Sequence, residues 1–80
     1  MRFELYTDVA LTHDIPEHRL RRGDVVKIVD HHLSPAGENG YSIEVFNAIG
    51  DTIAVTAVPE SALEPLHKGE VLSVRALAAK

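Results

Sequence analysis

The sequence predicts an all-β fold of five short strands. Three observations lead to this prediction: β-branched residues predominate in the segment 24–30, apolar and polar residues alternate over 41–45, and turn-forming residues cluster at 34–40. These patterns are typical of short strands joined by turns. The 80 residues suffice for one core and one domain. We assign the domain to residues 1–76 and expect residues 77–80 to form a frayed C-terminal tail.

The central strand is expected within residues 21–30, where Gly23 allows a sharp entry and a nearly continuous run of β-branched residues follows. Such a run is typical of a strand that is covered on more than one side. An earlier strand is expected at residues 6–11, with Val9 and Leu11 on one face. The apolar and aromatic side chains near the start of the chain are expected to close one end of the core: Phe3, Leu5 and Tyr6.

Residues 12–22 form a polar connection that is long for a turn between two strands. Pro16 excludes a long helix or a central strand there, so at most one helical turn fits around residues 17–20. We expect Ile15 and Leu20 to hold this loop against the core. Because long loops in compact domains often carry function, this loop is the first candidate for a binding surface.

Turn residues fill positions 34–40, and the strand with the clearest two-residue period follows at 41–46. Phe46 falls on the polar side of that period, so either a bulge shifts the register or Phe46 is exposed. The next strand is expected at residues 52–58. We predict that its core-facing side chains are Ile53 and Val55, and that its outer face carries Thr52, Ala54 and Thr56.

Pro59 ends that strand, and residues 60–63 can form one helical turn before Pro65 stops it. A short last strand is predicted at residues 70–75. A long first loop and a helical turn before the last of five strands indicate a small SH3-like barrel, whereas an OB-fold needs longer strands and a helix midway. The side chains predicted to be buried together are Val26, Ile28, Tyr41, Ile43, Val45, Ile53, Val55 and Leu63.

The chain also resembles a known family over roughly residues 3–66. The segments that carry the resemblance are LYTDVAL (5–11), DIPE (14–17), LRRGDVV (20–26) and TIAV (52–55), with the Pro59 and Leu63 that follow. The family consists of small bacterial proteins catalogued as a domain of unknown function. The resemblance implies an SH3-like architecture and brings no catalytic residues. Some relatives are encoded beside small toxin-like proteins, which implies an antitoxin or immunity role.

Charge and composition limit the classes of function. The 12 acidic and 8 Lys or Arg side chains give a formal net charge of −4, which disfavours a general nucleic-acid binder because such domains are normally basic. No apolar run approaches the ~18 residues that span a bilayer, and no signal-like leader opens the chain, so we expect no membrane association. The lack of cysteine favours the cytoplasm, since small secreted domains usually carry disulfides.

The histidines are the candidate metal ligands: His13, His18, His31, His32 and His67. His31 and His32 are neighbours on a strand and point to opposite faces, and nothing fixes the spacing of His13 and His18. We therefore expect solvent-exposed histidines and no metal or other cofactor. The sequence has no cysteine, no glycine-rich phosphate loop and no serine with a nearby histidine–carboxylate pair, so we expect no enzymatic activity.

The sequence thus favours a non-enzymatic module that binds a protein partner and is a monomer or weak homodimer. An acidic domain can mask a basic partner, which suits an antitoxin. The candidate contact residues are His13, Glu17, His18, Arg19, Arg21, Arg22 and Phe46. A reader of proline-rich peptides is less favoured, because such grooves usually contain tryptophan and this chain has none.

The alternative function is a nucleic-acid contact through the basic cluster of residues 19–27. The segment 22–29 resembles KOW-type segments of ribosomal and transcription proteins. However, no aromatic residues that could stack on bases are interleaved with these charges. We therefore rank nucleic-acid binding below protein binding.

Overall fold

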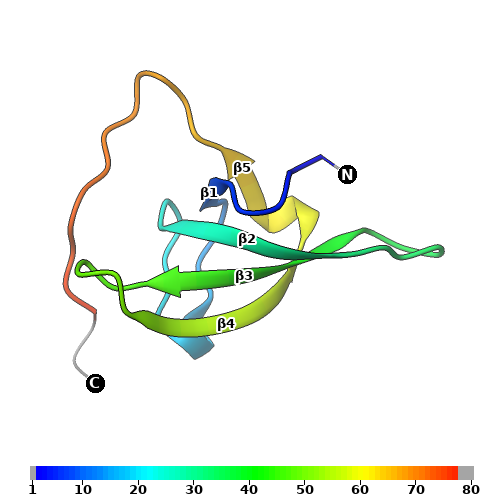
Figure 1. The fold of residues 1–80 in the computed structure, drawn as a ribbon, viewed down its shortest axis with the longest axis horizontal. Helices are drawn as coiled ribbons and strands as arrows, with labels where there is room; N and C mark the ends of the chain where they lie inside the picture. Colours follow the sequence, from blue (N-terminus) through cyan, green and yellow to red (C-terminus); the bar gives the residue numbers. More distant parts are fainter. Residues whose placement is uncertain (1, 78–80) are drawn as a thin grey trace.

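The computed structural model describes residues 2–77 and shows one antiparallel five-stranded sheet (Figure 1). Its strands are β1 (Asp8–Leu11), β2 (Val25–His32), β3 (Gly40–Phe46), β4 (Thr52–Pro59) and β5 (Leu63–Pro65), and its two 3-10 turns are η1 (Pro16–His18) and η2 (Glu60–Ala62). The strand order is β4-β3-β2-β1-β5. The all-β, five-stranded prediction is confirmed. The sheet is not closed, because β4 and β5 form its two edges without pairing to each other, so the predicted barrel closure is not confirmed.

β2 is the central strand, as predicted, and pairs with β1 on one side and β3 on the other. Val26 and Ile28 point into the core and are almost completely buried, while the alternate residues on the opposite face are half-buried. The strand begins later than predicted because residues 21–24 form a turn. In this turn the Asp24 N–H donates to the Arg21 carbonyl at 3.0 Å, and Gly23 has a φ of 91°.

The core joins the inner face of the sheet to the N-terminal residues and to η2. Six of the eight predicted core residues are buried: Val26, Ile28, Tyr41, Ile43, Val45 and Leu63. Tyr41 is completely buried, and its hydroxyl accepts a hydrogen bond from the Phe3 N–H at 3.2 Å and donates to Glu60 Oε1 at 3.4 Å. A buried phenol needs such partners, since an unsatisfied polar group in the core is costly.

The start of the chain agrees only in part with the prediction. Phe3 is buried and packs edge-on against Tyr41, with ring centroids 5.5 Å apart. Leu5 and Tyr6 are exposed, so their assignment to the core was wrong. Tyr6 has a φ of 65°, which interrupts the extended chain, and the first strand begins only at Asp8.

The predicted orientation of β4 was wrong by one residue, because the side chains of Ile53 and Val55, which were expected in the core, are exposed by 41% and 59%. The pairing with β3 places Ala54 opposite Val45 and puts the residue at position 56 opposite Ile43. Residues directly opposite in an antiparallel pair share a face, so Ala54, Thr56 and Val58 face the core. Val58 is the buried member of that row.

Phe46 shows both features that the sequence left as alternatives. The β3–β4 register shifts between Val45 and Phe46, as at a bulge, and Phe46 is exposed by 38%. A bulge ends regular pairing and turns the chain, which fits its position at the start of the β3–β4 turn.

The C-terminal part also differs from the prediction. The helical turn before the last strand is confirmed as η2, but the last strand is β5, and the segment 70–75 has no regular structure. β5 forms where it does because Leu63 fills the core and pairs with Leu11 of β1. Figure 1 shows the segment 66–77 as an arc outside the sheet. Apart from Leu77, the tail predicted at 77–80 lies outside the described residues.

The described part of the chain contains no helix with the length and apolar character needed to cross a membrane.

The register of β4 can be tested with two valines. Val45→Ala should lower the free energy of unfolding by about 1–3 kcal/mol, because Val45 is buried and its loss leaves a cavity. Val55→Ala should cost less than about 1 kcal/mol, since Val55 projects into solvent. Urea unfolding of both variants measures the difference. A larger loss for Val55→Ala would contradict the register described above.

A glycine pair tests the turn into β2. Gly23 has a φ of 91° with open space around its Cβ position, whereas Gly69 has equal space and no positive φ. Gly23→Ala should destabilise by about 1–2 kcal/mol, because an L side chain resists this backbone conformation. Gly69→Ala should be neutral or slightly stabilising. Equal thermal midpoints for the two variants would show that the left-handed conformation of Gly23 is not required.

Candidate functional site

The connection between β1 and β2, residues 12–24, is a long but firmly held loop, which we call the β1–β2 loop. Ile15 and Leu20 are buried, as predicted, and exchange two backbone hydrogen bonds of 2.9 and 3.1 Å across the loop. The Thr12 N–H donates to the Ala62 carbonyl at 2.9 Å, which fastens the start of the loop to η2. The loop is therefore part of the folded domain and has a defined shape.

Two aspartates brace this loop from within. Asp14 Oδ1 accepts a hydrogen bond from the Arg22 N–H at 2.9 Å, and Asp24 Oδ2 accepts one from the Arg21 N–H at 2.8 Å. Aspartate commonly accepts backbone N–H groups in turns, so the position of Asp24 beside Gly23 could have suggested this role. Neither of these two hydrogen bonds was predicted from the sequence.

The predicted contact residues of the loop lie on its outer surface. His13, Glu17, His18, Arg19, Arg21 and Arg22 are all exposed, and within the described residues their charged groups form no ion pair. Arg19 follows η1 in the left-handed region, with a φ of 59°. The structure thus brings six of the seven predicted residues to one loop. The seventh, Phe46, lies on another element, at the end of β3.

Arg75 holds the segment 66–77 onto the β1–β2 loop. Its Nε donates to Asp24 Oδ1 at 2.9 Å, its Nη2 donates to Asp24 Oδ2, and the same Nη2 contacts the Arg19 carbonyl at 3.1 Å. Partial burial alone raises the pKa of the Asp24 carboxyl, but hydrogen bonds from Arg75 and from the Arg21 N–H outweigh it, and that pKa lies below its ordinary value. Sequence reasoning missed this pair, whose members are 51 positions apart.

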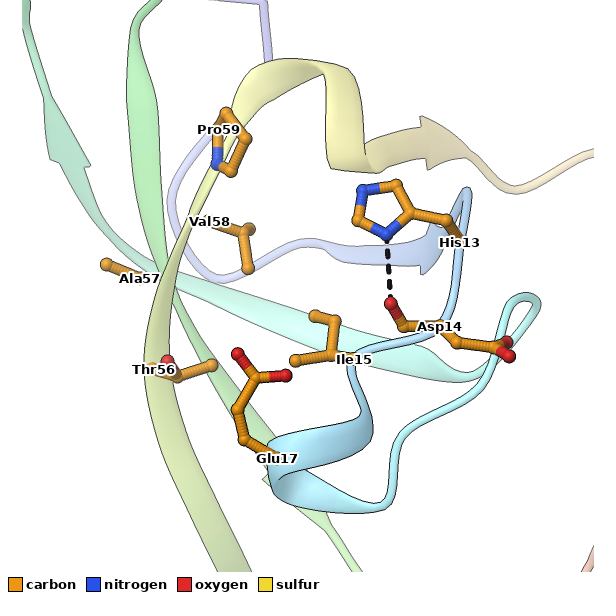
Figure 2. Close-up of a pocket in the computed structure, with 8 residues that line it drawn as sticks. All are labelled: His13, Asp14, Ile15, Glu17, Thr56, Ala57, Val58 and Pro59. Atoms are coloured by element: carbon orange, nitrogen blue, oxygen red, sulfur yellow. Dashed lines mark hydrogen bonds between the residues drawn. The ribbon is translucent and has the colours of Figure 1, made fainter.

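A shallow gap separates the β1–β2 loop from β4 (Figure 2). Its lining residues are His13, Asp14, Ile15, Glu17, Thr56, Ala57, Val58 and Pro59. In Figure 2 the Glu17 carboxylate lies over the gap, between Ile15 and β4, whereas the Asp14 carboxylate points away from β4. The volume of about 220 Å³ is below the ~300–1,000 Å³ of small-molecule sites. The gap therefore suits individual side chains better than a cofactor.

Two of the other candidate ligands and Lys27 have partners within the domain, whereas His67 is exposed. His31 is half-buried rather than solvent-exposed, and its Nε2 lies 2.8 Å from the Phe3 carbonyl oxygen. His32 Nε2 lies 2.7 Å from Ser42 Oγ. Lys27, part of the predicted basic cluster, pairs with Asp8 at 3.1 Å. Among residues 2–77 no three histidine or carboxylate side chains are grouped so that they could hold a metal ion.

The fold and the loop define a small all-β domain that presents a charged, hydrogen-bonded loop beside an open sheet edge. The chain belongs to a family described as a domain of unknown function (DUF4926), which matches residues 5–65. Searches of curated proteins and of solved structures found no significant match. The family match ends at the last residue of β5, so the segment 66–77 lies outside the matched region.

The Asp24–Arg75 pair should make stability depend on acid pH. Because the folded chain lowers the pKa of Asp24, its ionised form stabilises the fold above the unfolded value of about 3.9, and this stabilisation is lost as pH falls through the folded pKa. Asp24→Asn should therefore flatten the loss of stability below about pH 4. Arg75→Ala should flatten it partly, because the Arg21 N–H remains.

Urea unfolding at a series of pH values measures this dependence. Glu4→Gln is the matched control, because the Glu4 carboxylate has no hydrogen bond or ion pair among the described residues. An acid profile of Asp24→Asn identical to that of the wild type would contradict the assignment.

Proposed function

We propose that this chain is a non-enzymatic module that binds a protein partner through the β1–β2 loop. One observation carries the proposal: the backbone of the loop is braced by Asp14 and Asp24, yet six polar side chains project from it without ion pairs in the described structure. These side chains contribute little to the fold. A loop that is already ordered loses less conformational entropy on binding than a mobile one, which favours affinity.

The proposal includes an SH3-like architecture. It is supported by the strand order β4-β3-β2-β1-β5, by the long loop between β1 and β2, and by the 3-10 turn η2 immediately before β5. In small β domains of this kind, the loops at the ends of the strands carry the binding surface, while the sheet holds them in place.

An antitoxin or immunity role is the specific form of the proposal. The net charge of −4 supports a basic partner, because complementary charge raises the rate of encounter and helps to exclude other partners. The partner would be the toxin-like protein encoded beside the gene. We further propose a cytoplasmic location, supported by the lack of cysteine, and a monomeric or weakly dimeric state.

Nucleic-acid binding remains the weaker alternative. The basic residues that would contact phosphates are partly neutralised, since Lys27 pairs with Asp8 and Arg75 with Asp24. Three exposed guanidinium groups on the loop remain, those of Arg19, Arg21 and Arg22. Because the domain as a whole is negatively charged, three arginines provide only a weak attraction for phosphate groups.

Charge reversal on the loop tests the proposed function. The variant Glu17→Lys should weaken the complex with the product of the adjacent gene at least about tenfold, because it replaces a carboxylate that attracts a basic partner by a cation that repels it. The control Glu4→Lys changes net charge by the same amount away from the loop. It should change affinity only slightly. Calorimetric titration measures affinity, and thermal unfolding confirms that both variants fold.

Three results would contradict the proposal. The first is the absence of a complex with the adjacent gene product, and the second is equal weakening of that complex by Glu17→Lys and Glu4→Lys. The third is micromolar binding of mixed-sequence RNA or duplex DNA that falls steeply with salt, measured by fluorescence anisotropy, because released counterions make such binding salt-dependent.

A further inference from the structure

The free edge of β4 is unusual in composition. β4 pairs with β3 only, and none of its eight residues is charged. Side chains of Ile53, Val55 and Ala57 form an exposed apolar row on its outer face. Natural sheets usually protect an exposed edge with charged residues, bulges or a covering element, because unpaired backbone groups attract another strand. The composition of β4 is therefore typical of an edge strand that can pair with an additional strand.

The register identifies the backbone groups that this edge offers. The Glu60 N–H donates to the Asn39 carbonyl at 2.9 Å, one step beyond the pair of Pro59 and Gly40. Hydrogen-bonded and non-bonded pairs alternate along an antiparallel ladder. The backbone groups of Val55 and Ala57 therefore face away from β3, and they have no backbone partner within the described residues.

The β1–β2 loop forms the opposite wall of the space beside this edge. Thr56 to Pro59 line one side of the gap, and residues 13–15 and 17 line the other. A single extended chain could hydrogen-bond to β4 and place alternate side chains in the gap, against Ile15. A second copy of the whole sheet fits less well, because it would bring two loops that each carry Glu17 to the same place.

The charge of the residues that line the gap indicates what charge a bound segment should carry. Glu17 places its carboxylate over the gap, and the residue has no ion-pair or hydrogen-bond partner in the described part of the chain (Figure 2). Neither lysine nor arginine lines the gap. A cationic side chain on an incoming strand would supply the missing partner, and a carboxylate there would be repelled.

We propose that the β4 edge and Glu17 form a site for an extended, basic segment of a protein partner, which adds to the sheet as a further strand. The backbone of Val55 and Ala57 binds the segment, and Glu17 selects its charge. This inference rests on the proposed function and names the way in which the partner is recognised. It extends the site from the loop alone to the loop and the neighbouring strand edge.

The backbone part of the site can be blocked by one substitution. Ala57→Pro removes an N–H that points to the free edge, and it should leave the β3–β4 ladder intact because Ala57 and Ser42 form a non-bonded pair. Ala57→Val is the matched control, since it keeps the N–H and suits a strand. Glu17→Gln removes the charge and keeps the shape of the side chain.

Two synthetic peptides serve as probes, both of alternating valine and threonine, one with arginine and one with glutamate at each end. Fluorescence anisotropy should show binding of the arginine peptide only. Binding should persist in Ala57→Val, weaken at least about tenfold in Glu17→Gln and vanish in Ala57→Pro. Hydrogen exchange should show new protection of the Val55 and Ala57 amides in the complex. The inference is wrong if the arginine peptide does not bind, or if it binds equally to Ala57→Pro.

The same variants separate this inference from the proposed function. If loop charge reversal weakens the complex with the adjacent gene product but Ala57→Pro does not, the strand edge is not used and the loop still is. If neither change matters, both ideas fail. A dimer of the free protein that Ala57→Pro converts to monomer would show that a second copy occupies the edge, which also overturns the proposal.

Discussion

The inward-facing side chains of β2 and β3 are the constraint on which the other elements depend. Ile28 lies opposite Ile43, and both are completely buried. Because side chains alternate along a strand, fixing this pair fixes the faces of the residues on both strands and, through β3, on β4, as far as the register shifts after Ile28 and Val45. Tyr41, two residues before Ile43, extends the same row and joins it to Phe3 and to η2. The exposure of Ile53 and Val55 on β4 thus follows from the packing of β2 and β3 in the centre of the sheet.

The sequence predicted the elements of this domain better than their orientation. The β-branched run after Gly23 and the turn residues at 34–40 identify β2, β3 and the connection between them. β4 could not be oriented in the same way, because both of its faces carry uncharged residues that a core can hold, and only the pairing with β3 determines which face is inside. The segment 70–75 has good strand composition, yet the short β5 is the one whose Leu63 fills the core.

The same distinction holds for the candidate site. The exposed residues of the β1–β2 loop were predictable, because they are polar residues in a long connection around Pro16. Two features of the candidate site join segments far apart in the chain: the bonds of Asp24 to Arg75, and the position of Glu17 across the gap from β4. No local pattern contains such contacts, since they arise from the three-dimensional course of the backbone. Within the loop, acidic side chains have divided roles, with Asp14 and Asp24 bound to the backbone and Glu17 open to solvent.

The end of the family match coincides with the end of the packed part of the domain. The match ends at Pro65, two residues after the last buried side chain, and beyond it Arg75 makes the bonds that reach back to the β1–β2 loop. Core packing therefore places almost no restriction on the sequence or length of residues 66–74. Changes in the sequence or length of this segment should cost little stability, provided that the guanidinium of Arg75 still reaches Asp24. The hydrogen bonds of Arg75 to Asp24 and to the Arg19 carbonyl tie the segment to the domain.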